Sequence, residues 1–286
     1  SPSVEENVEK ARALVHAGAK EIRVTGQDTG VYGWDTGDRK LPELLDRICD
    51  IDGDFRVRLG MANPGGIHGI HEELADVFAE NEELYDFIHA PVQSGSDDVL
   101  ADMRRQHRVA KFREVVETFD DRLDHWTLST DFIVGFPTET EADHELSMDL
   151  LAEVRPEKIN VTRFSKRPGT DAADMKGLGG TVKKERSKAM SELKMEVVGE
   201  AYESMVGEEF GVLVVEEGTG DSVKCRDDAY RQIIVQNAPE RGVEVGDFLT
   251  VEVTGHNTVY AFGEPVDEPR SDAAGVDGAD PVPSDD

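Results

Sequence analysis

The stretch IRVTGQDTGVYGWD, from Ile22 to Asp35, decides the fold. Its first half has the branched apolar residues of a β-strand, and its second half is rich in glycine and other turn residues. The residues before it predict a helix, because Ser3 and Glu6 form a capping box and Gly18 lies at the expected C-terminal cap. A helix is therefore followed by a strand that ends in small and polar groups.

The same unit recurs along the chain. Short apolar runs lie at 55–61, 86–93, 126–136 and 158–165, and helical patterns lie near 41–50, 70–80, 97–119 and 140–154. Strands that alternate with helices at a spacing of about 30–40 residues predict βα units and a parallel sheet. Five strands are visible and the pattern opens on a helix, so we expect a partial barrel whose first strand precedes this sequence.

The carboxyl ends of the five expected strands share one character. All are small, polar or glycine-rich, and they read TGQ (25–27), GMANPGG (60–66), QSGS (93–96), VGFPTE (134–139) and FSKRPGT (164–170). In α/β barrels the loops at this end build the ligand site. The sequence therefore predicts a site formed jointly by these loops.

The remainder of the chain has a different pattern. We expect residues 1–180 to form the partial barrel and 181–206 a charged linker helix. Five short strand-like runs within 207–265 predict a small all-β barrel. Residues 266–286 contain mostly Asp, Ala, Gly and Pro, which predicts a disordered acidic tail.

Composition narrows the class of protein. No apolar run approaches the length of a membrane-spanning helix, and the polar N-terminus does not resemble a signal peptide, so we expect a cytoplasmic protein without membrane contact. The two cysteines, Cys49 and Cys225, exclude a disulfide framework and a metal cluster held by cysteines of this chain alone. His68 and His71 lack a third ligand, so no metal site is expected.

The net charge of −30 normally disfavours nucleic acid as a partner. An acid-rich surface spread over the whole chain also suits a halophilic cytoplasm, where salt screens long-range repulsion. The charge therefore does not decide the partner. Three groups of cations are local exceptions that could bind phosphate or pair with nearby acids: 104–113, 163–167 and 183–188.

Four segments together resemble a known family. VTGQDTGVYG (24–33), HAPVQSGSDDVLADMRR (89–105), STDFIVGFPTETEAD (129–143) and FSKRPGT (164–170) are similar, in order and spacing, to the signature blocks of radical SAM methylthiotransferases. Residues 207–265 resemble the RNA-binding TRAM domain that ends these enzymes. The fold class implied is α/β: a partial (βα)6 radical SAM barrel lacking its first strand, followed by a small five-stranded all-β TRAM-like barrel.

The wording GQDTGVYG is closest to the archaeal and eukaryotic branch of the family. That resemblance implies transfer of a methylthio group to C2 of N6-threonylcarbamoyladenosine at position 37, in the anticodon loop of tRNA. It implies S-adenosylmethionine and two [4Fe–4S] clusters as cofactors of the full-length enzyme, and an electron donor that reduces the clusters. The family's cluster domain and its C-x3-C-x2-C loop are not in this sequence, so we expect the chain alone to be inactive.

The resemblance also assigns roles to residues. No catalytic side chain and no metal ligand is expected in this chain. The residues expected to bind the cofactor are Thr25, Gly26, Gln27, Gln93, Ser94, Arg105, Asp131, Ile133, Val134 and Gly135. The residues expected to bind the substrate RNA are Phe164, Arg167, Thr170, Arg226, Tyr230 and Arg231, with Tyr230 as a stacking platform.

Two alternatives stay open at this stage. A related methylthiotransferase could act on an isopentenyl-type adenosine or on a ribosomal protein, since a TRAM-like end occurs in those enzymes too. A chain without the cysteine loop could also serve as a non-catalytic RNA-binding module. An in-frame C-x3-C-x2-C motif shortly upstream would favour the enzyme over the binding module.

Overall fold

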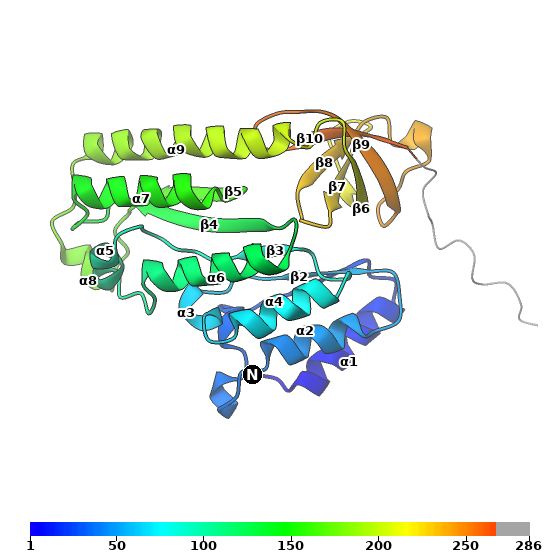
Figure 1. Cartoon of the computed structure of the whole chain (residues 1–286), viewed down its shortest axis with the longest axis horizontal. Coiled ribbons are helices and arrows are strands. Elements are labelled where there is room, and N and C mark those ends of the chain that lie inside the picture. Colours follow the sequence, from blue (N-terminus) through cyan, green and yellow to red (C-terminus); the bar gives the residue numbers. More distant parts are fainter. Residues whose placement is uncertain (267–286) are drawn as a thin grey trace, which may run out of the picture.

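A computed structural model describes residues 1–266 of the chain. Two bodies are joined by one long helix: an α/β body at the N-terminal side and a small β-barrel after it (Figure 1). From residue 267 on, the predicted acidic tail lies outside the described residues. In the described part of the chain, every helix is too short or too polar to cross a membrane.

Five parallel strands form the α/β body, and they follow one another in chain order. The strands β1 (Glu21–Val24) and β2 (Arg56–Leu59) pair with each other, and β3 (Phe87–His89), β4 (Thr127–Val134) and β5 (Lys158–Arg163) form a second group. Single bridges, Val57 to Leu84 and Met61 to His89, connect the two groups. The structure thus confirms the parallel, partial barrel expected from the strand pattern.

Helices cover the outer face of these strands. They are α1 (Val4–His16), α2 (Leu41–Cys49), α4 (His71–Glu80), α6 (Val109–Arg122) and α7 (Glu141–Val154). Helix α2 shows why they pack there, since Leu41, Leu44, Leu45 and Ile48 recur at helical spacing and all are buried. The capping box of Ser3 and Glu6 is present at the start of α1, as predicted.

Short helices lie in the loops between these elements. They are the 3-10 helices η1 (Thr29–Val31) and η2 (Trp34–Thr36), and the helices α3 (Pro64–Ile67), α5 (Asp97–Asp102) and α8 (Asp171–Asp174). The helix expected over 97–119 is split into α5 and α6. Arg104 explains the break, because its φ of 58° is left-handed and cannot continue a right-handed helix.

Side chains alternate along the strands and so divide the residues between two faces. Val57 and Leu59 of β2 are buried in the hydrophobic core, whereas Arg56 and Arg58 between them are only half-buried. The same alternation places His89 of β3 and Asp131 of β4 on the inner face. The inner face of the sheet is therefore the polar one.

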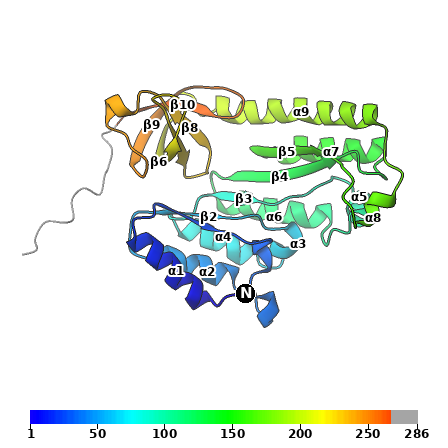
Figure 2. The same ribbon diagram turned by 180° about the vertical axis from the view of Figure 1, so that it is seen from behind.

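Helix α9 (Gly180–Glu203) connects the two bodies and packs against β5 and α7 (Figures 1 and 2). The second body is a closed barrel with the strand order β10-β8-β7-β6-β9. Its strands are β6 (Glu209–Glu217), β7 (Val223–Asp227), β8 (Gln232–Val235), β9 (Phe248–His256) and β10 (Ala261–Pro265), with the 3-10 helix η3 (Pro239–Arg241) between β8 and β9. This barrel confirms the predicted five-stranded all-β fold.

The small barrel docks at the amino ends of the parallel strands. Arg56, at the start of β2, pairs with Asp228 at 3.0 Å, and the backbone N–H of Asp86 donates to the carbonyl oxygen of Asp228 at 2.7 Å. The ring of Tyr230 packs against Tyr85 and Phe87, with centroids 4.8 and 5.0 Å apart. The barrel therefore lies at the end of the strands opposite to their carboxyl-end loops.

Candidate functional site

A cavity with a volume of about 970 Å³ lies at the carboxyl ends of β4 and β5. That size matches the pockets that enclose small cofactors. Residues from four loops or strands line it, and seven of them belong to the predicted set: Gln93, Arg105, Asp131, Ile133, Phe164, Arg167 and Thr170. Folding thus brings together residues that are up to 77 positions apart in sequence, from 93 to 170.

Gln93 adopts an unusual backbone conformation at the edge of this cavity. Its φ is 73°, in the left-handed region that residues other than glycine rarely occupy. Its N–H donates to the carbonyl of Asp131 at 2.8 Å, and its carbonyl accepts from the N–H of Ile133 at 2.9 Å. These two hydrogen bonds hold the strained residue beside β4. Strain of this kind is typical of functional sites.

Asp131 is the centre of a polar group on the inner face. Asn160 donates its side-chain N–H to Asp131 Oδ1 at 2.7 Å, and His89 Nε2 lies 3.4 Å from Asp131 Oδ2. Burial alone would raise the pKa of Asp131, but the contacts with His89 and Asn160 and the charge of Arg105 together lower it below its usual range. Asp131 is therefore a carboxylate at neutral pH.

The sequence analysis missed His89 and Asn160. Both could have been found from the alternation of side chains along β3 and β5, combined with the register that pairs Asp131 with Asn160. Arg105 Nε is buried and makes no hydrogen bond to any described residue, whereas His89 Nε2 is buried with only its 3.4 Å contact to Asp131. Buried polar atoms without a partner are uncommon, so the cavity presents polar groups that a ligand could satisfy.

Thr25, Gly26 and Gln27 line a second hollow of about 520 Å³, along β1. A third hollow of about 580 Å³ shares Asp28 with this one and Arg105 with the first cavity. Asp28 fixes the loop after β1, because its carboxylate accepts from the backbone N–H groups of Gly30 and Asn63, each at 3.0 Å. Seven of the ten predicted cofactor residues thus line adjoining hollows: Thr25, Gly26 and Gln27 the second, and Gln93, Arg105, Asp131 and Ile133 the first.

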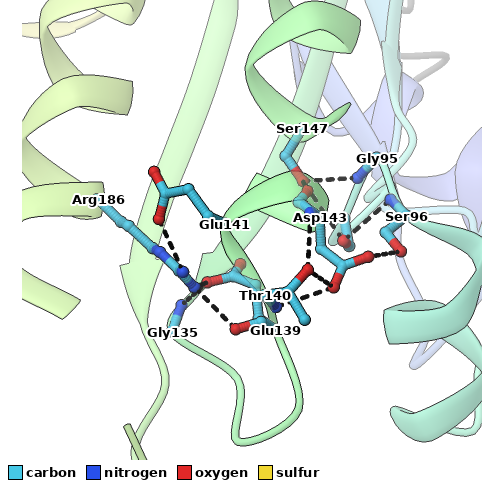
Figure 3. A network of polar contacts seen from close by, with 10 residues as sticks. Gly95, Ser96, Gly135, Glu139, Thr140, Glu141, Asp143, Ser147 and Arg186 are labelled. Carbon is cyan, nitrogen blue, oxygen red and sulfur yellow. Dashed lines mark hydrogen bonds and ion pairs between the residues drawn. The ribbon is translucent and has the colours of Figure 1, made fainter. Parts of the chain in front are cut away.

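Ser94 corrects one prediction. It is 1% exposed, and its hydroxyl group lies 3.4 Å from the hydroxyl of Ser147 and accepts from the N–H of Ser96. Ser147 also accepts from the N–H of Gly95 at 2.8 Å (Figure 3). Ser94 therefore holds its loop against α7 and does not face the cavity, because α7 packs directly behind the loop.

Val134 ends β4, Gly135 begins the loop after it, and neither residue lines the cavity. The Val134 side chain is 1% exposed and packs in the hydrophobic core, while Gly135 has a φ of 74° and donates its N–H to Glu139 Oε2 at 2.7 Å. Glycine suits this left-handed conformation because it has no Cβ. The expected backbone contact of these two residues with a cofactor stays a prediction.

A buried ion pair fixes the same loop. Arg186 of α9 donates to Glu139 Oε2 at 2.6 Å, to the Glu139 carbonyl at 3.0 Å and to Glu141 Oε2 at 3.0 Å (Figure 3). The Glu139 side chain is completely buried. Burial raises the pKa of Glu139, against the lowering effect of Arg186. Helix α9 is thereby tied to the loop that follows β4.

The three RNA-binding residues expected on the small barrel lie instead at the junction between the bodies. Tyr230 and Arg231 are each 6% exposed, and Arg231 pairs with the buried Asp227 at 2.7 Å. The prediction that Tyr230 is a stacking platform and Arg231 an RNA contact is wrong, because docking of the barrel buries both side chains. Arg226 is half-buried, with its guanidinium 4.6 Å from the Tyr230 ring centroid.

Comparison with known proteins gives concordant results. Residues 1–151 match the family model described as "Radical SAM superfamily". A probable threonylcarbamoyladenosine tRNA methylthiotransferase of Archaeoglobus fulgidus is 41% identical over 262 residues, which cover 92% of this chain and 60% of the relative. The threonylcarbamoyladenosine tRNA methylthiotransferase of Drosophila melanogaster is 37% identical over 269 residues, which cover 93% of this chain and 47% of the relative.

The chain thus spans about half to three fifths of the length of these curated relatives. Among solved structures, coproporphyrinogen III oxidase of Escherichia coli, a radical SAM enzyme, matches with a TM-score of 0.52 and 13% identity, covering 83% of this chain and 60% of that one. This likeness concerns the fold alone. Since the family model covers more than half of the sequence and the parallel strands have the matching architecture, the chain belongs to the radical SAM superfamily.

Proposed function

We propose that the chain is the barrel and C-terminal part of a methylthiotransferase that modifies C2 of N6-threonylcarbamoyladenosine at position 37 of tRNA. The observation that carries this proposal is the 41% identity to a relative of that name, over 92% of the chain and therefore over both bodies. No observation favours an isopentenyl-type adenosine, a ribosomal protein or a purely RNA-binding role.

The residues of the cavity fit S-adenosylmethionine, which superfamily membership implies as a cofactor. Arg105 would bind the carboxylate of the methionine part, and Asp131 would accept from the ribose hydroxyl groups. Thr25 and Gln27 would accept from the ammonium group. The unpartnered Nε of Arg105 supports this fit, because Arg105 lines the cavity and a bound polar ligand would satisfy this nitrogen.

The residues present do not fit a [4Fe–4S] cluster, the second cofactor that the superfamily implies. No group of three or more metal-ligating side chains occurs within residues 1–266. Cys49 and Cys225 lie in different bodies, both are buried, and burial raises the pKa of each thiol to about 12, which disfavours the thiolate that binds iron. We infer that cluster ligands come from outside this sequence, and we derive no step through a cluster.

Bound S-adenosylmethionine would supply the radical chemistry and the methyl group of the reaction. The contribution of this chain is to bind, orient and exclude water. Phe136 and Phe164 pack edge to face, with centroids 5.1 Å apart, and form an apolar part of the cavity wall where the adenine would lie. Thr170 donates its hydroxyl to the carbonyl oxygen of Arg167 at 2.8 Å and so shapes the rim.

RNA binding is proposed at the rim of the same cavity. Three cations of the first group are engaged by acids: Arg104 pairs with Asp171, Arg108 with Asp97 and Arg113 with Glu153. Arg163 and Arg167, in contrast, are exposed, line the cavity and have no ion pair with any described residue. We propose that these two arginines bind phosphates of the anticodon loop. An electron donor and a cytoplasmic location belong to the same proposal.

Mass spectrometry of tRNA nucleosides tests the function. A strain that lacks the gene should accumulate threonylcarbamoyladenosine and lose its methylthio derivative. The full-length gene should restore the derivative, the Asp131→Asn variant should restore it poorly, and the Arg113→Gln variant should restore it fully, because Arg113 is exposed and far from the cavity lining. Unchanged methylthio-threonylcarbamoyladenosine in the deletion strain would refute the proposal.

A further inference from the structure

Three cations gather around two aromatic rings where the small barrel meets the strands. Arg58 of β2 has its guanidinium carbon 5.0 Å from the ring centroids of both Phe87 and Tyr230. The ammonium nitrogen of Lys158, at the start of β5, is 5.6 Å from both centroids. The guanidinium carbon of Arg226, of β7, is 4.6 Å from the Tyr230 centroid. Three positive charges therefore surround one small region.

These cations lack acidic partners. Within residues 1–266, the side chains of Arg58 and Lys158 make no ion pair or hydrogen bond, and the side chain of Arg226 donates only to the carbonyl oxygen of Tyr230, at 3.4 Å. The Nε atoms of Arg58 and Arg226 are buried without any hydrogen-bond partner. A chain with 61 acidic residues and 31 basic ones could easily supply a carboxylate, so its absence at this position needs a reason.

Three acids on neighbouring segments are already engaged. Glu21 pairs with Arg23 and accepts from the hydroxyl of Tyr85 at 3.5 Å. Asp228 pairs with Arg56 at 3.0 Å, and Glu216 pairs with Lys224 at 2.8 Å. None of these carboxylates is in contact with the three unpaired cations. The local charge is therefore positive although the chain is strongly acidic.

Burial and the neighbouring positive charges lower the proton affinity of Lys158. The pKa of Lys158 is lowered to about 8, first by burial of its ammonium group and then by the positive charges of Arg226 and Arg58. The faces of Phe87 and Tyr230 offset part of this repulsion, since aromatic faces carry partial negative charge. An anion between the cations would remove the remainder and would satisfy the two buried Nε atoms.

We propose that Arg58, Lys158 and Arg226 form a binding site for a phosphate group at the junction of the two bodies. A phosphate offers several oxygen acceptors, which matches two guanidinium groups and one ammonium group. Although neighbouring groups partly desolvate its ammonium group, the Lys158 residue as a whole is exposed at the surface, so an anion can approach it from solvent. Because Arg58 and Lys158 belong to the parallel strands and Arg226 to the small barrel, a bound phosphate would tie the two bodies together.

This site lies at the amino ends of the strands, opposite to the cavity proposed for the cofactor. Phosphate binding there does not depend on the proposed methylthio transfer. The phosphate could belong to an RNA backbone or be a free ion. A normal nucleoside profile in the deletion strain would overturn the proposed function and leave the phosphate site untouched.

Thermal unfolding of the 286-residue chain tests the site. Inorganic phosphate at neutral pH should raise the midpoint temperature more than chloride of equal ionic strength, and the increase should saturate. The Lys158→Met and Arg226→Gln variants should lose this increase, while the control Lys188→Met should keep it, because this exposed lysine of α9 already pairs with Glu192 at 3.5 Å. In chloride alone, Lys158→Met should be no less stable than the unmodified chain, because a repelled charge is removed.

Binding of an anticodon stem–loop RNA at several salt concentrations distinguishes the two sources of phosphate. If the phosphate belongs to RNA, Lys158→Met should lower the affinity and reduce the slope of log K against log salt by about 1, and Lys188→Met should not. A lost phosphate response with an unchanged RNA slope assigns the site to the free ion. The proposal is overturned if neither quantity changes, or if Lys158→Met and Lys188→Met behave alike.

Discussion

Replacement of Arg186 by Met should strongly destabilise the α/β body. Arg186 and Glu139 form a pair at 2.6 Å in which the side chains are 8% and 0% exposed. The substitution leaves Glu139 buried with one remaining donor, the N–H of Gly135. Removing one partner of a buried ion pair costs about 3–5 kcal/mol, because the other charge stays in a medium of low polarity. We expect the loss of unfolding free energy to lie near the lower end of this range, since protonation of Glu139 would remove its buried charge.

The loss of stability in Arg186→Met should depend on pH, because Glu139 is titratable. Burial raises the pKa of Glu139, and without Arg186 the opposing effect is gone. A carboxyl group whose pKa is raised on folding contributes stability below its unfolded pKa, and this contribution is lost as the pH rises. The deficit of Arg186→Met should therefore be smaller at about pH 5 than above pH 7. The double variant Arg186→Met, Glu139→Gln should recover part of the loss, because no charge remains to be buried.

Urea unfolding followed by tryptophan fluorescence measures the effect, because both tryptophans, Trp34 and Trp126, belong to the α/β body. The matched control is Arg113→Met, which breaks an exposed pair with Glu153 at 2.7 Å and should cost about 0–1 kcal/mol. The reasoning is refuted if Arg186→Met and Arg113→Met lose equal free energy of unfolding, or if the double variant is as unstable as the single one.

Three further outcomes are expected. Burial and the charge of Asp228 raise the pKa of Asp86 to about 7, so the free energy of unfolding should fall as the pH rises from about 4 to about 7. Above pH 7, Asp86→Asn should be more stable than the unmodified chain by about 1–2 kcal/mol, after allowance for solvent screening. Equal urea midpoints of the two proteins above pH 7 would contradict this expectation. Gly95→Ala should lower the free energy of unfolding by at least about 2 kcal/mol, because the new Cβ would lie 2.3 Å from the carbonyl oxygen of Leu146. The control Gly255→Ala should be tolerated in the same urea assay, because its new Cβ would have no atom within 4 Å. Anaerobic reconstitution followed by iron analysis should leave this chain with almost no bound iron, and about four irons per chain would disprove the assignment of the cluster ligands to other residues.

Local patterns in the sequence were sufficient to predict the helices and strands of both bodies. The capping box at Ser3, the alternation of apolar runs with helical patterns and the five short runs after residue 207 depend on neighbouring residues, and each appears in the structure. The split of the helix expected over 97–119 was not foreseen, because it depends on the left-handed conformation of one residue, Arg104. Left-handed residues other than glycine carry only a weak signal in sequence.

Sequence patterns did not predict all the side-chain contacts of the candidate site. Asp131 was expected from its motif, but its contacts with His89 and Asn160 follow from the register of three strands, in which residues 42 and 29 positions away come into contact. Register is decided by burial of the opposite face and by pairing across the sheet. Pattern analysis of single segments therefore found the loops of the cavity and missed Asn160, which lines it, and His89, which contacts Asp131.

By itself, the sequence determined that parallel βα units precede a small β-barrel and that polar loops gather at one end of the strands, because these properties arise from residues close together in the chain. Tertiary structure alone decided that Tyr230 and Arg231 are buried, that Ser94 faces α7 and that Arg58, Lys158 and Arg226 share one region. These outcomes depend on how distant surfaces dock. Docking follows from the sum of many apolar and electrostatic contacts, none of which is local in sequence.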